Sequence, residues 1–460
     1  MKCFCSKNSR NVLFILCLAI LPSVVFAQSK TITAVNRRQF QEIASKLDVG
    51  GDLFLVVNTA KILDRLMEAA IAADVGIPAD DPHEKEIRET LTRFNKFLTR
   101  NGFSAVHGAG MSSVPLKDGV NSIKFYISRD YIDLNLPLWR GLVGWQPRSL
   151  ISLDFIPADT VMARAGTPEL GSLWKVYRSA IDEVAPDSSK ASFRKWHENI
   201  NATMGVEVSE LLNSLRDEIM VAVRFSETEQ SLVPAKGGFV SIPAPSFLIV
   251  VGTNNDILKG VIEAKLAKYS VLLNESKVGD VLMRTARNKL PSLIPMQPTY
   301  ASEAGFFLLG STPDIVADAL FAYRHKNGLK SRPEFKKAFQ GLPMVNNGIV
   351  YISPEMGQII GHIHSANIDK VVAGAEKHPA TSRIIRQLLT YNGKDQSAAL
   401  VIQNWKNGVM VMGNSAIGGQ DAITRLIAYP LRSLPDIFSS TTESNKKTLV
   451  SVFRNTFNQE

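Results

Sequence analysis

Short apolar runs that end in a helix-capping residue recur along this chain. In the stretch GFFLLGSTPDIVADAL, the apolar residues 306–309 are followed by Ser-Thr-Pro-Asp and then by apolar residues at helical spacing. A continuous apolar run of this length is typical of a strand buried on both faces. Thr312 can cap a helix, Pro313 suits its first position, and Asp314 favours the positive end of the helix dipole. The stretch therefore predicts a buried strand followed by a capped amphipathic helix.

This strand–cap–helix pattern occurs five times. The apolar runs are Leu53–Val57, Thr160–Ala165, Phe247–Val251, Phe306–Leu309 and Ile349–Ile352. The expected caps are Thr59, Thr167, Asn254, Thr312 and Ser353. The intervals between caps are unequal, whereas a solenoid has a fixed period. We therefore expect about five strand–capped-helix units with different insertions. Internal duplication and independent recurrence of a common local pattern both remain open.

The insertions carry the alternating pattern of half-buried strands. Ser122–Ser128 and Glu218–Phe225 place apolar residues on one side, and Ala398–Ile402 and Val409–Met412 flank the hairpin signal Asn407-Gly408. Hairpins favour antiparallel pairing. We therefore predict an α+β fold of antiparallel or mixed sheets backed by helices. Further helices are expected at 82–99, 207–216 and 382–390.

The first 27 residues have the pattern of an export signal. Lys2, Lys7 and Arg10 precede an apolar core, and Val25-Phe26-Ala27 supplies small residues at the expected cleavage point. The core is short for a membrane span, which needs about 20 apolar residues. An uncleaved anchor is the alternative. We therefore expect an exported protein, periplasmic or extracellular, with no transmembrane segment in the mature chain.

Composition supports an ordinary globular protein after export. All three cysteines lie in the predicted signal, so the mature chain is expected to be free of disulfides. Three positive charges also lie there, which leaves +6 of the formal +9 charge on the mature chain. Lysines and arginines are scattered, so nucleic acid is not expected as a partner.

The domain organisation is predicted from one Gly/Pro-rich segment. The stretch KGGFVSIPAP at 236–245 is the best candidate for a boundary. It divides the chain into an N-terminal lobe at 28–236 and a C-terminal lobe at 246–438, both α+β. A flexible tail is expected at 439–460.

Several segments, taken in order, resemble an exported bacterial family of unknown function. The segments are FIPADTVMARAGTPELGSLWK, MGVEVSELLNSLRDEIMVAV, PSFLIVVGTNNDILKGVIEAKL, GFFLLGSTPDIVADAL and LKSRPEFKKAFQGLP. The resemblance covers roughly residues 155–366. It implies an exported protein with strand–Thr-Pro-Asp/Glu–helix units, and it carries over no site residue.

Motifs for chemistry are weak. Ser192 and Lys195 match the S-x-x-K pattern of penicillin-recognising enzymes, but the companion motifs S-D-N and K-T-G are missing. His362 and His364 are two residues apart on a predicted helix, so their side chains would point in different directions. The acidic cluster at 80–84 is explained by a helix start.

Other motifs fail for similar reasons. Gly108 and Gly110 lack the third glycine of a dinucleotide-binding loop. Asn201 lies in a glycosylation sequon, which would be idle in a bacterium. The sequence therefore assigns no catalytic, cofactor-binding or metal-binding residue.

Three functions remain as hypotheses. The first is an exported non-enzymatic envelope protein that serves as a binding, carrier or scaffold module, with an apolar ligand or an envelope protein as its partner. The alternative is a hydrolase whose site is assembled from distant segments, with His107 and His197 as candidates. The third is a partner-binding protein that uses an exposed strand edge.

Overall fold

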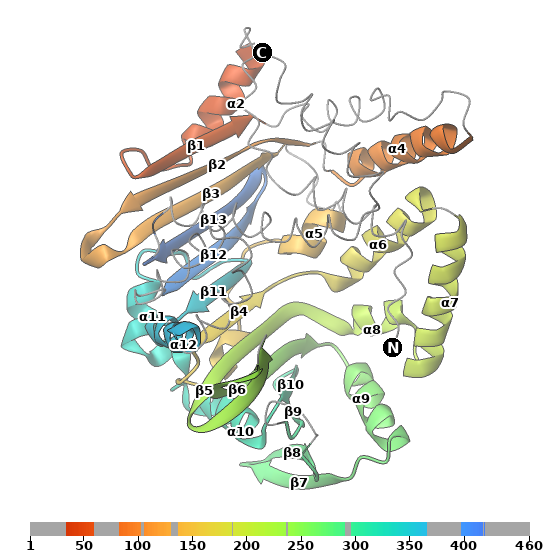
Figure 1. The fold of residues 1–460 in the computed structure, drawn as a ribbon, viewed down its shortest axis with the longest axis vertical. Helices are drawn as coiled ribbons and strands as arrows, with labels where there is room; N and C mark the ends of the chain where they lie inside the picture. Colours follow the sequence, from red (N-terminus) through yellow and green to blue (C-terminus); the bar gives the residue numbers. More distant parts are fainter. Residues whose placement is uncertain are drawn as a thin grey trace.

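In the part of the chain that the structure describes, thirteen strands form one antiparallel sheet in the order β1-β2-β3-β13-β12-β11-β4-β5-β6-β10-β9-β8-β7 (Figure 1). This computed structural model describes residues 34–58, 82–102, 105–129, 137–185, 187–235, 238–289, 296–365, 397–416 and 418. The strands are β1 (Leu53–Asn58), β2 (Val106–Pro115), β3 (Asn121–Arg129), β4 (Met162–Gly166), β5 (Leu215–Ala235), β6 (Gly238–Thr253), β7 (Leu273–Val278), β8 (Val281–Ala286), β9 (Thr299–Glu303), β10 (Phe306–Gly310), β11 (Gly348–Ile352), β12 (Ala398–Trp405) and β13 (Gly408–Ser415).

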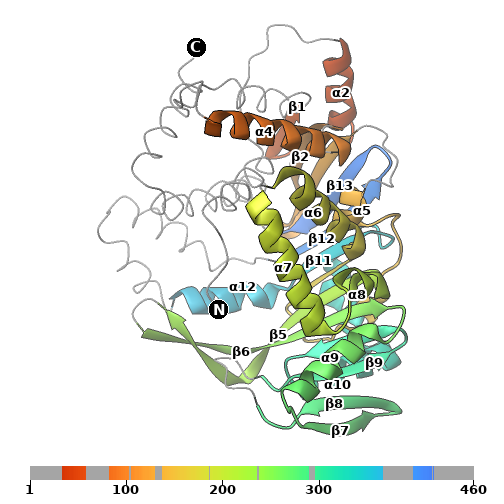
Figure 2. The same cartoon turned by 90° about the vertical axis from the view of Figure 1, so that its right-hand side faces the viewer.

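Helices surround the sheet, and together they confirm the predicted α+β class. The α-helices are α2 (Ala34–Ala44), α4 (Pro82–Arg100), α5 (Pro137–Val143), α6 (Leu170–Val184), α7 (Asp187–Met204), α8 (Val208–Ser214), α9 (Ile257–Lys268), α10 (Pro313–His325), α11 (Pro333–Ala338) and α12 (Pro354–Ser365). Short 3₁₀ turns are η1 (Lys117–Gly119), η2 (Ser152–Phe155) and η3 (Leu329–Ser331). In Figure 2, α2 and α12 lie on opposite sides of the sheet.

One face of the sheet, here called the inner face, holds the main core. Met220, Leu248 and Leu308 on neighbouring strands are fully buried there against α10. The ring of Phe155 in η2 lies between Phe306, at 5.4 Å between centroids, and Tyr323 of α10, at 4.2 Å. Apolar burial of this kind is the largest stabilising contribution to a fold without disulfides.

Helix α2 packs on the same face at the other end of the sheet. Gly108 and Gly110 of β2 lie beneath it, and a Cβ atom at Gly110 would come within 2.6 Å of Ile43 and 2.7 Å of Leu47. Two glycines at alternate strand positions therefore allow the helix to approach the backbone closely. Gly108 and Gly110, which partly match a dinucleotide-binding loop in sequence, therefore serve to bring α2 close to β2.

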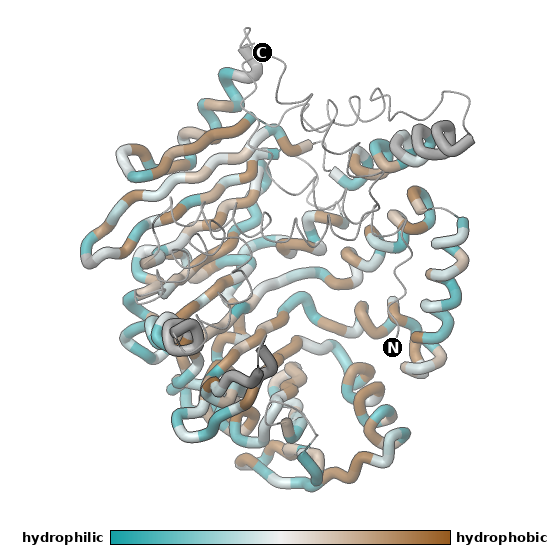
Figure 3. The backbone as a smooth tube through the Cα atoms, viewed as in Figure 1, coloured by the Kyte–Doolittle hydropathy of each residue, from teal (hydrophilic) through white to brown (hydrophobic). Residues whose placement is uncertain are grey.

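The opposite face, here called the outer face, is only partly covered. Helix α9 lies against it at β8 and β9, where Glu263 accepts a hydrogen bond from Tyr300 and pairs with Arg284. Helices α5 to α8 gather at one end of the strands (Figures 1 and 2). Hydrophobic residues are spread over the central strands, with hydrophilic residues interspersed (Figure 3).

Several predicted elements match the observed ones in position. Helix α10 begins after Thr312 as predicted, but the Thr312 side chain makes no capping hydrogen bond. Helix α12 begins after Ser353, whose hydroxyl accepts the backbone N–H of Met356 at 3.4 Å. Helix α6 begins at Leu170, later than Thr167 suggested, because the Thr167 hydroxyl bonds to Asn347 instead. Helix α9 likewise has Asp256 as its N-cap, in place of Asn254.

The division into two lobes stays a prediction. Residues 238–245 form part of β6, and β5 and β6 pair along most of their length. Strands from before and after this segment alternate in the sheet, since β4 lies between β5 and β11. The predicted signal (1–27), the cap at Thr59, the helix at 382–390 and the tail (439–460) lie outside the described residues.

Candidate functional site

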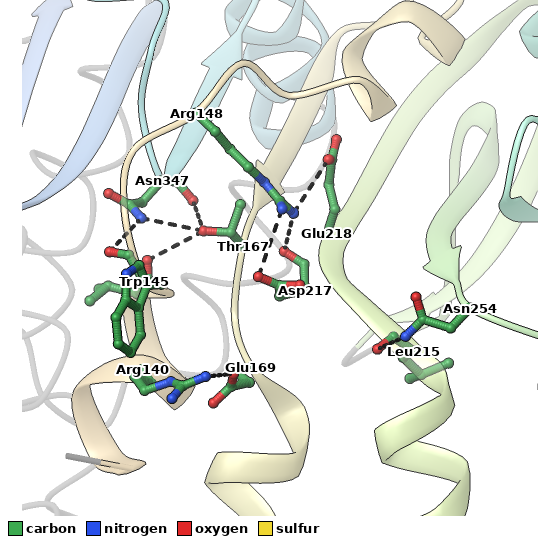
Figure 4. Close-up of polar contacts among 11 residues, drawn as sticks. Arg140, Trp145, Arg148, Thr167, Glu169, Leu215, Asp217, Glu218, Asn254 and Asn347 are labelled. Carbon is green, nitrogen blue, oxygen red and sulfur yellow. Dashed lines mark hydrogen bonds and ion pairs between the residues drawn. The ribbon is translucent and has the colours of Figure 1, made fainter. Parts of the chain in front are cut away.

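Buried polar side chains connect the ends of β4, β11 and β12 to the segment after α5. The Asn347 side chain donates from Nδ2 to Thr167 Oγ1 and to the Trp145 carbonyl oxygen, both at 3.4 Å (Figure 4). Thr167 Oγ1 in turn donates to the Asn347 carbonyl at 3.2 Å. Asn404 donates from Nδ2 to the Gly144 carbonyl at 2.7 Å and from its backbone N–H to Asn347 Oδ1 at 2.7 Å. These bonds satisfy backbone groups at strand ends, so the network positions the loop.

Arg129 extends this network from β3. Its Nη2 donates to Asn404 Oδ1 at 2.6 Å and to the Trp405 carbonyl at 3.0 Å, and its guanidinium lies 4.7 Å from the Trp139 ring centroid. Burial lowers the pKa of Arg129 to about 10. The guanidinium therefore stays protonated at neutral pH, where the oxygens of Asn404 and Trp405 accept hydrogen bonds from it.

A carboxylate is buried at the start of β5. Glu218 is 3 % exposed, and its Oε1 accepts the backbone N–H of Ser152 at 2.6 Å. Its Oε2 lies 3.7 Å from Arg148, which also pairs with Asp217 at 3.8 Å (Figure 4). Glu218 therefore holds η2 against β5 and so belongs to the architecture of the core.

A polar pocket of about 230 Å³ opens beside these groups. Its walls come from three segments: Arg140 of α5, residues 169–172 and Lys175 at the start of α6, and residues 212, 213 and 215–217 at the junction of α8 and β5. Arg140 forms an ion pair with Glu169 (Figure 4) and lies 4.5 Å from the Trp145 ring centroid. The pocket therefore combines fixed charges with open space.

The pocket contains one arrangement with a conceivable reactive group. Ser172 donates its hydroxyl to Glu169, whose other oxygen is bound by Arg140. Lys175 lies one helical turn after Ser172 and also lines the pocket. Ser172 and Lys175 have the same S-x-x-K spacing as Ser192 and Lys195. Ser172 is 8 % exposed, and as the third residue of α6 it bonds to the side chain of the N-cap residue Glu169, so the contact has a structural explanation.

A second feature is a row of side chains across the outer face of the central strands. The registers place Arg164 of β4 opposite Val221 of β5, Val221 opposite Ile249 of β6, and Ile249 opposite Leu309 of β10. Val221, Ile249 and the nearby Phe247 are each 37 % exposed. Apolar side chains left uncovered in the middle of a sheet are informative because contiguous patches of this kind mark interaction surfaces.

The candidates from the sequence do not come together. Ser192 donates to the Ser188 carbonyl on the exposed helix α7, away from the pocket lining. His197, on the same helix, packs among aromatic rings, with Phe193 at 5.9 Å and Trp174 at 5.6 Å between centroids. His107 lies on β2. The two histidines therefore lie on different elements, and neither lines the pocket.

The remaining motifs have local explanations. Asn201 of α7 donates from Nδ2 to the Glu207 carboxylate at 2.5 Å, and its Oδ1 accepts the Val208 backbone N–H at 3.1 Å. These two bonds connect α7 to α8. His362 and His364 both lie in α12. Within the described ranges, no three His, Cys, Asp or Glu side chains gather as a metal site.

Neither the pocket nor the outer row is predicted from the sequence. The lining of the pocket depends on α5 and α8 meeting α6, which is a long-range contact. The alternation of Ile219, Val221 and Val223 predicts that these residues share one face, but it does not predict that Val221 stays 37 % exposed.

Known proteins offer no further guide. No family model matches the chain, and neither a curated protein nor a solved structure does so. The resemblance to an exported family over residues 155–366 therefore stays a prediction. In the described part of the chain, no helix combines the length and apolar character needed to span a bilayer.

Proposed function

We propose that the protein is an exported, non-enzymatic envelope protein that binds or carries an apolar ligand. The partly exposed apolar row on the outer face, centred on Val221 and Ile249, is the observation that carries this proposal. The periplasmic or extracellular location rests on the signal-like N-terminus. The strand–capped-helix units would supply the rigid frame that holds the row.

The position of the row favours an apolar ligand over a pairing strand. Strands β5 and β6 each have a neighbour on both sides, so their ladder groups are used within the sheet. A ligand on this face therefore meets side chains rather than free backbone groups. Fully burying a Val, Ile or Phe side chain contributes about 1.5–3 kcal/mol. Covering the exposed parts of Val221, Phe247 and Ile249 would contribute about 2–3 kcal/mol in total, before the ligand's own burial.

Mass spectrometry of solvent extracts tests this function. Gently purified protein should release an apolar compound in stoichiometric amount, and Ile249→Asn should release much less. The variant Tyr269→Asn is a matched control because Tyr269 is exposed at the end of α9, away from the row. Absence of any co-purifying compound, together with no uptake of added apolar probes, would contradict the proposal.

Hydrolysis is a second candidate because the pocket brings Ser172 next to Glu169 and Lys175. A nucleophile requires a base within hydrogen-bonding distance and a group that orients the base. Glu169 and Arg140 occupy those two positions. A panel of ester, peptide and glycoside substrates tests this, with Ser172→Ala and the helix α7 variant Ser192→Ala compared in parallel. Turnover that is equal in all three proteins, or absent from the wild type, would exclude Ser172 as a nucleophile.

A further inference from the structure

Arg164 is a cation placed among apolar neighbours on the outer face. Its register partners are Val221 on β5 and Val350 on β11. The side chain is exposed, and it makes no hydrogen bond or ion pair with any residue that the structure describes. An arginine without a carboxylate partner beside a partly exposed apolar row combines one fixed charge with one apolar surface.

Two other arginines of the sheet have carboxylate partners. Arg224 of β5 is in contact with Asp159 and Asp318, and Arg284 of β8 with Glu263 and Glu275. Arg216 of β5 has no such partner among the described residues, but it lines the polar pocket and not the apolar row. Arg164 has its guanidinium available for a carboxylate or phosphate, either of which an arginine can bind with two parallel hydrogen bonds.

We propose that Arg164 binds the anionic head group of a single-chain amphiphile whose apolar chain lies across Val221, Ile249 and Leu309. This inference rests on the proposed binding function and names its ligand class. Neighbouring strands lie about 4.8 Å apart, so the row from Arg164 to Leu309 spans roughly 14 Å. That span suits a fatty-acid-sized chain. The ligand is a monomeric molecule lying on the face, not a membrane surface.

Binding of three dodecyl compounds to the mature chain tests the proposal. Dodecanoate, dodecyl phosphate and dodecanol share one chain and differ in head group, and titration calorimetry below their micelle concentrations measures each Kd. Both anions should bind about tenfold more tightly than the alcohol, as expected for one charge-assisted contact. Arg164→Gln should remove this preference and leave the affinity for dodecanol unchanged, whereas Arg164→Lys should retain part of it.

Control variants separate the role of Arg164 in head-group binding from the binding of the apolar chain. Arg178→Gln changes an exposed arginine on α6 and should preserve the anion preference. Ile249→Asn should weaken the binding of all three compounds by a similar factor because Ile249 contacts the dodecyl chain that they share. An anion preference that persists in Arg164→Gln would overturn the head-group assignment while the binding function stands. Binding of none of the three compounds would overturn both, and binding to anionic vesicles alone would overturn the monomeric ligand.

Discussion

The hydrogen bond between Glu218 and the Ser152 backbone gives a stringent test of how the core is held. Ser152 is completely buried, and its N–H donates to Glu218 Oε1 at 2.6 Å. We compare Glu218→Ala, which deletes the acceptor, with Glu218→Gln, which keeps an acceptor oxygen without charge. Arg148→Met serves as the third variant because it removes the ion-pair partner but leaves the hydrogen bond.

The magnitudes follow from burial. A buried N–H without a partner costs about 1–3 kcal/mol, and the vacated volume adds to that cost. We therefore expect a loss of about 3 kcal/mol in the free energy of unfolding for Glu218→Ala. Glu218→Gln should lose about 1 kcal/mol because only the charge assistance is removed. The Arg148 side chain is 42 % exposed, so Arg148→Met should lose less than 1 kcal/mol.

Urea unfolding followed by tryptophan fluorescence measures these differences as shifts of the midpoint at constant slope. The decisive comparison is between the two Glu218 variants. If Glu218→Gln were as unstable as Glu218→Ala, the charge and not the hydrogen bond would hold η2. If Arg148→Met were the least stable of the three, the long 3.7 Å contact would outweigh the bond to Ser152, contrary to the geometry.

Three further predictions concern stability. Burial raises the pKa of both Tyr126 and Tyr351 to about 12, so between pH 10 and pH 12 the unfolded chain loses phenol protons that the folded chain keeps. The free energy of unfolding should fall over that range by up to about 2.7 kcal/mol per tyrosine. In Tyr126→Phe or Tyr351→Phe, the contribution of the replaced tyrosine to this fall should be absent, which urea midpoints measured from pH 10 to pH 12 would show. Gly110→Ala should cost about 1–3 kcal/mol through overlap with Ile43, and the double variant with Ile43→Ala should be less destabilised than the sum in the same assay. Ser353→Ala should cost about 1 kcal/mol in thermal unfolding through loss of the α12 cap, and no change would show that the 3.4 Å contact contributes nothing.

Local chemistry explains which parts of the fold the sequence predicts well. The α10 junction needs only neighbouring residues: an apolar run, Thr312 and Pro313. The start of α6 was misplaced because Thr167 bonds to Asn347, a partner 180 residues away. The same limit applies to the outer row. Alternation along β5 predicts that Val221 lies on the face opposite Met220, but only the assembled sheet shows that Val221 stays 37 % exposed and that Arg164 lies beside it.

The interleaved strand order has a consequence for how the chain reaches its native state. Strand β3 finds its second neighbour only in β13, and the paired residues Asn121 and Ser415 are 294 positions apart. Closing such distant pairs is slow because much chain entropy is lost before the contacts form. Until β13 and β11 have been synthesised, β3 and β4 each keep one unpaired edge that can template misassembly. We therefore expect nascent chains ending after β6 to aggregate unless a chaperone shields those borders.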